Sequence, residues 1–139
     1  MRIASLFALV VVVLNLGACN DKAVECTTFP DSLLVTIKNG ETKTIYECNN
    51  TQVKLSFNKV EDDSRCPNGA VCVWQGTAHI NINFNNSADN LILELKKEQT
   101  VEYQGSNYAI VFEALSPHPA IDSTINPAWY VATLKFSKK

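Results

Sequence analysis

Residues 72–85 read CVWQGTAHININFN, and this stretch decides the fold. One set of alternate residues is apolar or small, namely Cys72, Trp74, Gly76, Ala78, Ile80, Ile82 and Phe84. The other set is almost entirely polar and comprises Val73, Gln75, Thr77, His79, Asn81, Asn83 and Asn85. Successive side chains of a β-strand point to opposite faces. The pattern therefore predicts a long strand over 71–84, with Trp74 in the core and the face from His79 to Asn85 in water.

The same period-two alternation recurs along the chain, while helical periodicity is scarce. It predicts further strands at 33–38, 42–48, 52–60, 90–97, 100–104, 108–115 and 129–137. In the last of these, the residues that face one way are Tyr130, Ala132, Leu134 and Phe136. About eight short strands predict an all-β domain over 31–139, built as an antiparallel β-sandwich or a partly closed barrel.

Turn residues mark several of the strand boundaries. Asn39-Gly40 is the preferred pair for a tight type I′ hairpin turn between the first two strands. Asn49-Asn50 and Asn85-Asn86 also stand where the chain must reverse, because Asn tolerates the left-handed conformation. Gly105-Ser106-Asn107 is expected to close another hairpin. Residues 116–127 contain three prolines and are expected to form a long crossover loop, since proline supplies no ladder donor.

The chain opens with Arg2 and an apolar run over residues 3–16, which is typical of an export signal and too short to span a membrane. The run ends in Leu16-Gly17-Ala18-Cys19, which resembles the lipobox of bacterial lipoproteins. This resemblance implies cleavage ahead of Cys19 and a lipid on its thiol. We therefore expect a signal peptide over 1–18, a lipidated tether over 19–30, and an anchor in the cell envelope, at the outer membrane.

The five cysteines are an odd number for an exported protein. With Cys19 assigned to lipid, an even set remains, which predicts two disulfides. Four cysteines allow three pairings. We expect Cys66 to pair with Cys72 across a turn-rich loop, with Cys72 inward beside Trp74, and Cys26 to pair with Cys48.

Residues 63–76 carry a local pattern, Asp63-Ser-Arg-Cys-Pro, four residues, Cys72, then Trp74 and Gly76. It resembles a D-S-R-C-P-x4-C-x-W-x-G signature of small exported bacterial proteins without an assigned activity, which implies a fold and no mechanism. Arg65 can reach a carboxylate such as Asp62 or stack on an aromatic ring. Two interpretations stay open: a rigid structural corner, or a recognition corner that uses Asp63, Arg65 and Asn68.

Other function classes find little support in the sequence. The formal net charge is −2 with interspersed charges, so no basic surface for nucleic acid is expected. No catalytic motif, metal-ligand spacing or cofactor motif is present, and His79 and His118 are the only histidines. We expect a noncatalytic module that binds an envelope protein or glycan, or acts as a scaffold. The alternative is a small envelope enzyme or inhibitor acting through 61–70 and 116–128, which a pocket with two carboxylates, or a carboxylate beside His118, would favour.

Overall fold

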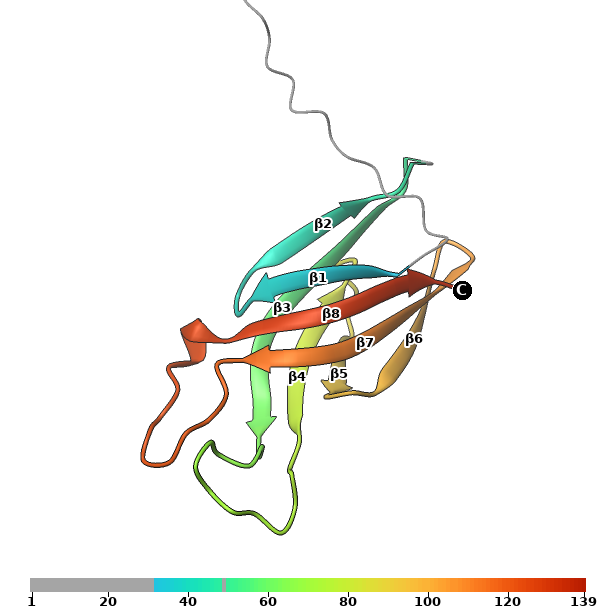
Figure 1. The fold of residues 1–139 in the computed structure, drawn as a ribbon. Helices are drawn as coiled ribbons and strands as arrows, with labels where there is room; N and C mark the ends of the chain where they lie inside the picture. The colour runs from blue at the N-terminus through green and yellow to red at the C-terminus, as the bar shows by residue number, and fades with distance from the viewer. Residues whose placement is uncertain (1–31, 49) are drawn as a thin grey trace, which may run out of the picture.

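The computed structural model describes residues 32–48 and 50–139, which form two antiparallel β-sheets packed face to face (Figure 1). The strands are β1 (Leu33–Lys38), β2 (Thr42–Tyr46), β3 (Gln52–Asp63), β4 (Ala78–Phe84), β5 (Asn90–Glu94), β6 (Glu98–Tyr103), β7 (Ser106–Ser116) and β8 (Val131–Lys138). A short 3₁₀ helix, η1 (Pro127–Trp129), precedes β8. The predicted all-β fold is confirmed, and its form is the sandwich.

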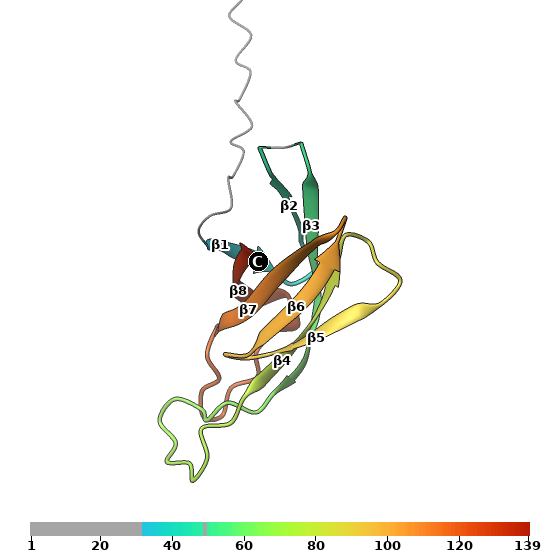
Figure 2. The same cartoon turned by 90° about the vertical axis from the view of Figure 1, so that its right-hand side faces the viewer.

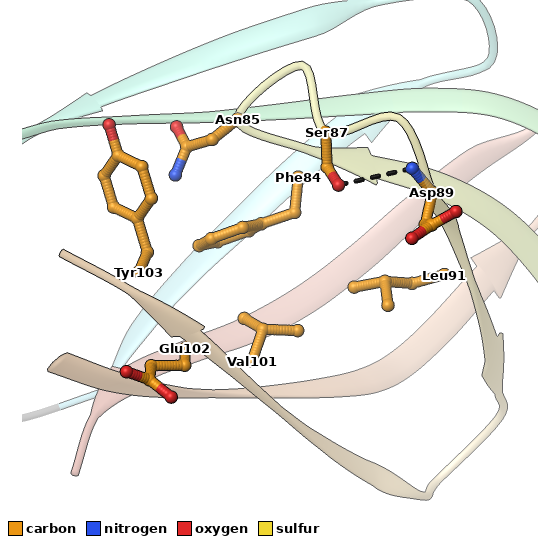
Figure 3. A pocket seen from close by; sticks show the side chains of 8 residues that line it. All are labelled: Phe84, Asn85, Ser87, Asp89, Leu91, Val101, Glu102 and Tyr103. Carbon is orange, nitrogen blue, oxygen red and sulfur yellow. Dashed lines mark hydrogen bonds between the residues drawn. The ribbon is translucent and has the colours of Figure 1, made fainter. Parts of the chain in front are cut away.

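One sheet has the strand order β1-β8-β7-β6 and the other has the order β2-β3-β4-β5. The chain passes between the sheets after β1 and again after β5. The edge strands β5 and β6 are joined by a short connection and diverge from it (Figure 2). Where they part, the sandwich is open and leaves a groove of about 490 Å³ beside Phe84 and Tyr103 (Figure 3).

The core lies between the sheets and follows the predicted parity. In β4 the buried side chains are Ala78, Ile80, Ile82 and Phe84, and in β8 they are Ala132, Leu134 and Phe136. Tyr108 of β7 stacks on Phe136 with ring centroids 5.2 Å apart. Burial of these apolar side chains is the main favourable contribution to the stability of the fold.

The outer face of β4 is less hydrated than the alternation predicts. Asn81 is only 8% exposed, because the side chains of Asn58 and Glu61 in β3 cover it. Asn58 Nδ2 donates a 2.8 Å hydrogen bond to Asn81 Oδ1, and Asn81 Nδ2 donates one of 2.8 Å to Glu61 Oε1. This polar network belongs to the sheet, because it satisfies the buried amide of Asn81.

The prediction that β4 begins near residue 71 is wrong, since the strand begins at Ala78. Trp74 is 83% exposed and Cys72 is also exposed. The break occurs at Gly76, which has φ +67° and lies so close to Ser64 that a Cβ would overlap the Ser64 carbonyl oxygen. The alternation between Cys72 and Gly76 therefore belongs to a loop and does not continue the strand.

The prediction of a hairpin at Asn39-Gly40 is also wrong. β1 pairs with β8 and β2 pairs with β3, so the turn connects the two sheets. Glu41 donates to the carbonyl of Lys38 at 2.9 Å and Gly40 has φ +79°, which fits a type II turn. The pairing of β1 with β8 and of β2 with β3 thus favours a type II turn here, although Asn-Gly by itself favours type I′.

The other predicted turns are confirmed. Asn85 and Asn86 have φ of 53° and 54° and connect β4 to β5. Gln104 and Gly105 form the β6–β7 turn, one residue earlier than predicted, with φ of 50° and 71°. Positive φ at both central residues is the type I′ conformation. Residue 49 lies outside the described residues, and Asn50 has φ 67° in the β2–β3 connection. The prediction that residues 116–127 form a crossover is wrong, because β7 pairs with β8 and this proline-containing segment is the long loop of a β7–β8 hairpin.

Candidate recognition surface at the loop end of the sandwich

Asp63 and Arg65 form a buried ion pair at the end of β3. Arg65 Nε lies 2.7 Å from Asp63 Oδ1 and Arg65 Nη2 lies 2.7 Å from Asp63 Oδ2. This two-bond geometry is the strong form of an arginine–carboxylate contact. Arg65 is 7% exposed. The predicted partner, Asp62, instead lies 3.7 Å from His79 on the outer face.

The ion pair joins three segments that are distant in sequence. Arg65 Nη1 donates to the Leu115 carbonyl at 2.5 Å, and Nη2 donates to the Pro117 carbonyl at 2.9 Å. Tyr130 donates its hydroxyl to Asp63 Oδ2 at 3.0 Å. The corner thus connects the end of β3 to the end of β7, to the β7–β8 loop and to the start of β8.

The hydrogen bonds at this corner shift the pKa values of Asp63 and Tyr130 in opposite directions. Burial disfavours the charged form of Asp63, but the hydrogen bonds from Arg65 and Tyr130 outweigh it and hold the pKa of Asp63 below its ordinary value. Burial and the hydrogen bond to Asp63 raise the pKa of Tyr130 to about 12. The corner is therefore built around an ionised Asp63 and a neutral Tyr130.

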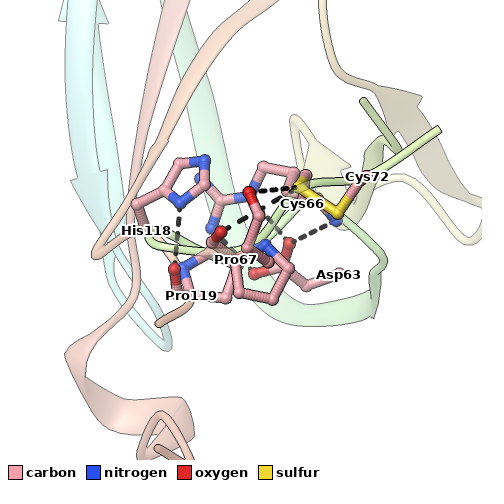
Figure 4. Close-up of a disulfide and its surroundings, with 8 residues drawn as sticks. Asp63, Cys66, Pro67, Cys72, His118 and Pro119 are labelled. Carbon is pink, nitrogen blue, oxygen red and sulfur yellow. Dashed lines mark hydrogen bonds and ion pairs between the residues drawn. A yellow bond between two sulfur atoms is a disulfide. The ribbon is translucent and has the colours of Figure 1, made fainter. Parts of the chain in front are cut away.

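The segment after the ion pair is a loop closed by the Cys66–Cys72 disulfide (Figure 4). Ser64 and Cys66 donate backbone hydrogen bonds of 2.9 Å to the carbonyls of Thr77 and Gln75, which joins the two arms of the loop. The backbone amide of Asn68 donates to the carbonyl of Pro119 in the β7–β8 loop at 2.8 Å. The predicted Cys66–Cys72 pairing is confirmed. Cys26 lies outside the described residues, so its pairing with Cys48 stays a prediction.

Apolar side chains project into solvent from this braced loop. Val71 and Val73 are almost fully exposed, and Trp74 follows them in the chain. In the neighbouring segments, Ile121 and Trp129 are 50% and 65% exposed. We call Val71, Val73 and Trp74 the apolar loop tip. Hydrophobic side chains are exposed here although the backbone that carries them is held by hydrogen bonds and a disulfide.

The three residues predicted to form a recognition corner have different environments. Asp63 and Arg65 are turned inward and hold the loop in place, whereas the side chain of Asn68 is exposed. Sequence reasoning missed Val71 and Val73 and placed Trp74 in the core. The available signal was that Val71, Val73 and Trp74 flank Cys72, which closes a ring containing the turn residues Asn68 and Gly69.

A groove between β5 and β6 is one of several concave features of the described residues. Its lining consists of Phe84, Asn85, Ser87, Asp89, Leu91, Val101, Glu102 and Tyr103. Figure 3 shows the side chains of Val101 and Tyr103 directed into the groove, whereas the carboxylate of Glu102, which lies between them in β6, is directed away from it. Asp89, in the β4–β5 connection, is the other acidic residue of the lining. This groove therefore lacks the converging pair of carboxylates that would favour the alternative of an enzyme.

The two histidines are in different settings. His79 has Nδ1 3.7 Å from Asp62 and Nε2 3.8 Å from Glu94 on the outer face of the sheet. His118 is exposed, and its Nδ1 lies 3.1 Å from the Pro119 carbonyl. Across residues 32–48 and 50–139, no carboxylate pairs with His118 and no group of three metal-ligating side chains is found. No helix within these residues is long and apolar enough to cross a membrane.

Searches of protein-family models, of curated proteins and of solved structures found no match to this chain.

Proposed function

We propose that the protein is a membrane-anchored envelope lipoprotein whose β domain is a noncatalytic binding module. The anchor rests on the leader and on the lipobox-like Leu16-Gly17-Ala18-Cys19. Two or more acyl chains hold a protein stably at a membrane, whereas one chain holds it only marginally. The proposed location is the outer membrane.

The single observation that carries the binding role is the apolar loop tip. Val71, Val73 and Trp74 are 103%, 92% and 83% exposed. Contiguous apolar surface is costly to leave in water, and on soluble proteins it marks sites of interaction. Tryptophan is also the residue type most enriched among the energetic centres of protein interfaces. The proposed partner is an envelope protein or a glycan, whose apolar or ring surface would cover Trp74.

The bracing of the loop supports the same proposal. The arms of the loop are joined by hydrogen bonds, its base is held by the Asp63–Arg65 pair, and its middle is closed by the disulfide. A loop that is already ordered loses little conformational entropy when it binds. This arrangement suits recognition better than an unbraced loop of the same composition.

The direction of the loop also fits an anchored module. β1 begins at Leu33 opposite Phe136 near the end of β8, whereas η1 lies just before the start of β8. The described chain thus begins at one end of the sandwich, and the loop and η1 lie at the other (Figure 1). A tether attached at Leu33 would leave the apolar loop tip pointing away from the anchoring membrane.

Site-specific photo-crosslinking in intact cells tests the binding role. A photoreactive phenylalanine analogue at Val73 should yield a discrete crosslinked product, and the same analogue at Gln52 should not. Gln52 is the matched control because it is exposed at the opposite end of β3, the strand that leads to the loop. Equal products from both positions, or no product from Val73, would contradict the proposal.

Fractionation tests the anchor separately. Wild-type protein should sediment with membranes and carry a lipid on Cys19, whereas Cys19→Ser protein should be soluble or unprocessed. A Cys19→Ser form that is still cut ahead of residue 19 and still fractionates with membranes would refute the lipid anchor without bearing on the loop.

A further inference from the structure

The strand β6 lies at the end of its sheet, and its outer edge is open. Among the described residues β6 pairs with β7 alone, and Tyr103 lies opposite Ser106 beside the two-residue turn. Facing residues of an antiparallel pair alternate between pairs that exchange hydrogen bonds and pairs that do not. The pair that closes a two-residue turn exchanges them, so Tyr103 and Val101 direct their backbone groups to β7. Thr100 and Glu102 therefore direct their N–H and C=O groups to the open edge.

The groove between β5 and β6 lies directly beside this edge. On the β6 side, Val101 and Tyr103 point into it (Figure 3). Phe84 and Leu91 add to its apolar lining, and its volume of about 490 Å³ is within the range of ligand sites. Successive side chains of a strand point to opposite faces. A strand added to the edge of β6 would therefore direct alternate side chains into an apolar groove.

The outer face of β6 is acidic at the same position. Glu102 is exposed and points away from the groove, between Val101 and Tyr103 (Figure 3). Among the described residues, no Lys, Arg or His forms an ion pair with its carboxylate. Opposite charges that face each other on neighbouring strands attract, and like charges repel. A Lys or Arg on the outer face of an added strand would thus meet a carboxylate that has no other partner.

The edge strand β2 carries a protection that β6 lacks. Lys43 of β2 lies opposite Leu55, whose side chain is buried, so Lys43 faces inward and lines a groove between β1 and β2. An inward-pointing charge keeps a foreign strand from pairing with an edge. The inward positions of β6 are Gln99, Val101 and Tyr103, none of which is charged. The edge of β6 is therefore better suited than that of β2 to receive another strand.

We propose that β6 binds an extended segment of a partner polypeptide, in which apolar residues alternate with Lys or Arg, as an additional antiparallel strand. The cationic residues lie on the outer face, and their backbone N–H and C=O groups pair with those of Thr100 and Glu102. The apolar residues between them enter the groove beside Val101 and Tyr103. Antiparallel pairing continues the arrangement of the sheet and is the more stable form per residue. The site is separate from the apolar loop tip and does not depend on it.

Calorimetric titration of the full-length protein in detergent tests this site. The probe is a blocked heptapeptide, Lys-Val-Lys-Val-Lys-Val-Lys, and its control is Lys-Lys-Val-Val-Val-Lys-Lys, which has the same composition and charge without the alternation. The alternating peptide should bind roughly tenfold more tightly than the control, because only its cationic and apolar residues lie on opposite faces of a strand. Equal affinity of the two peptides, or no binding of the alternating one, would overturn the proposal.

Backbone methylation tests the pairing itself. In the proposed antiparallel strand the N–H groups of the internal Lys residues face β6, and those of the Val residues face away. N-methylation of the internal Lys amides should therefore abolish binding of the alternating peptide, whereas N-methylation of its Val amides should leave the affinity unchanged. Binding that survives methylation at Lys, or is lost on methylation at Val, would overturn the proposed strand.

Variants and hydrogen exchange locate the binding on β6. Thr100→Pro removes an N–H from the open edge and none from the β6–β7 ladder, and it should weaken the alternating peptide roughly tenfold. Thr100→Ala, the matched control that keeps the amide, should bind like wild type. Glu102→Gln should weaken the peptide about threefold, as expected for one exposed ion pair.

In wild type, the amides of Thr100 and Glu102 should exchange rapidly in the free protein and slowly when the peptide is bound. Full affinity of a folded Thr100→Pro protein, or exchange of these two amides that the peptide does not slow, would overturn the site.

Discussion

Arg65 donates two hydrogen bonds of 2.7 Å to the carboxylate of Asp63, and the same guanidinium donates to the carbonyls of Leu115 and Pro117. One side chain thus joins β3 to β7 and to the β7–β8 loop. Because both charges are buried, each destabilises the fold unless the other is present to pair with it.

Removing one partner of the Asp63–Arg65 pair should be strongly destabilising. Asp63→Ala leaves a buried guanidinium without its counter-charge, which costs about 3–5 kcal/mol of unfolding free energy. The double variant Asp63→Leu with Arg65→Met should lose less than Asp63→Ala alone, because no buried charge remains. Urea denaturation of the three proteins measures both values. A loss below about 1 kcal/mol for Asp63→Ala would show that the pair does not brace the corner.

The same pair should make stability depend on acid pH. The folded pKa of Asp63 lies below its ordinary value of 3.8, so its contribution is complete above about 3.8 and is lost as pH falls through the lower folded value. The difference in unfolding free energy between wild type and Asp63→Asn should therefore be constant near neutrality and shrink below pH 3.8. A difference that does not change with pH would contradict an ionised Asp63.

Gly76 should tolerate substitution far less well than Gly105. Both have positive φ, of 67° and 71°, but a Cβ at Gly76 would overlap the Ser64 carbonyl oxygen, whereas nothing lies within 4 Å of one at Gly105. Gly105→Ala should cost about 1 kcal/mol through backbone strain alone. Gly76→Ala should cost about 3 kcal/mol or separate the arms of the loop. Equal thermal midpoints for the two variants would refute the close approach of residues 64 and 76.

These glycines show why sequence reasoning succeeded for the sheets and failed at the loop. Ile80, Ile82 and Phe84 face the core as their alternation predicts, because a regular strand has only two faces. Trp74 shares their parity by coincidence. The left-handed backbone at Gly76 separates the loop that carries Trp74 from the strand that follows. The strand begins only after Gly76 because Gly76 packs against Ser64, and this contact between distant residues cannot be predicted from the alternation of residues 72–85.

The residues of the groove and of the ion pair show the same limit. Phe84 and Tyr103 meet edge to face because β4 and β6 belong to different sheets that pack together, and this arrangement cannot be predicted from either segment alone. Arg65 was expected to reach a carboxylate, but which of the neighbouring aspartates it contacts depends on the direction of the chain at the end of β3.

The second disulfide can be tested by peptide mapping. Under nonreducing conditions, digestion should release Cys66 linked to Cys72 and Cys26 linked to Cys48. Closing the shorter ring should contribute about 2 kcal/mol on the chain-entropy model. Recovery of Cys26 linked to Cys66 or Cys72 would contradict both pairings.

Recognition through the apolar loop tip is tested most directly by measuring both the stability and the partner affinity of one loop variant. Val73→Ser combined with Trp74→Ser removes two exposed side chains, so its free energy of unfolding should stay within about 0.5 kcal/mol of that of wild type. The partner identified by crosslinking should bind it roughly 30-fold more weakly, which corresponds to about 2 kcal/mol for loss of a central tryptophan. A variant that remains folded and binds that partner as tightly as wild type would contradict recognition through the apolar loop tip.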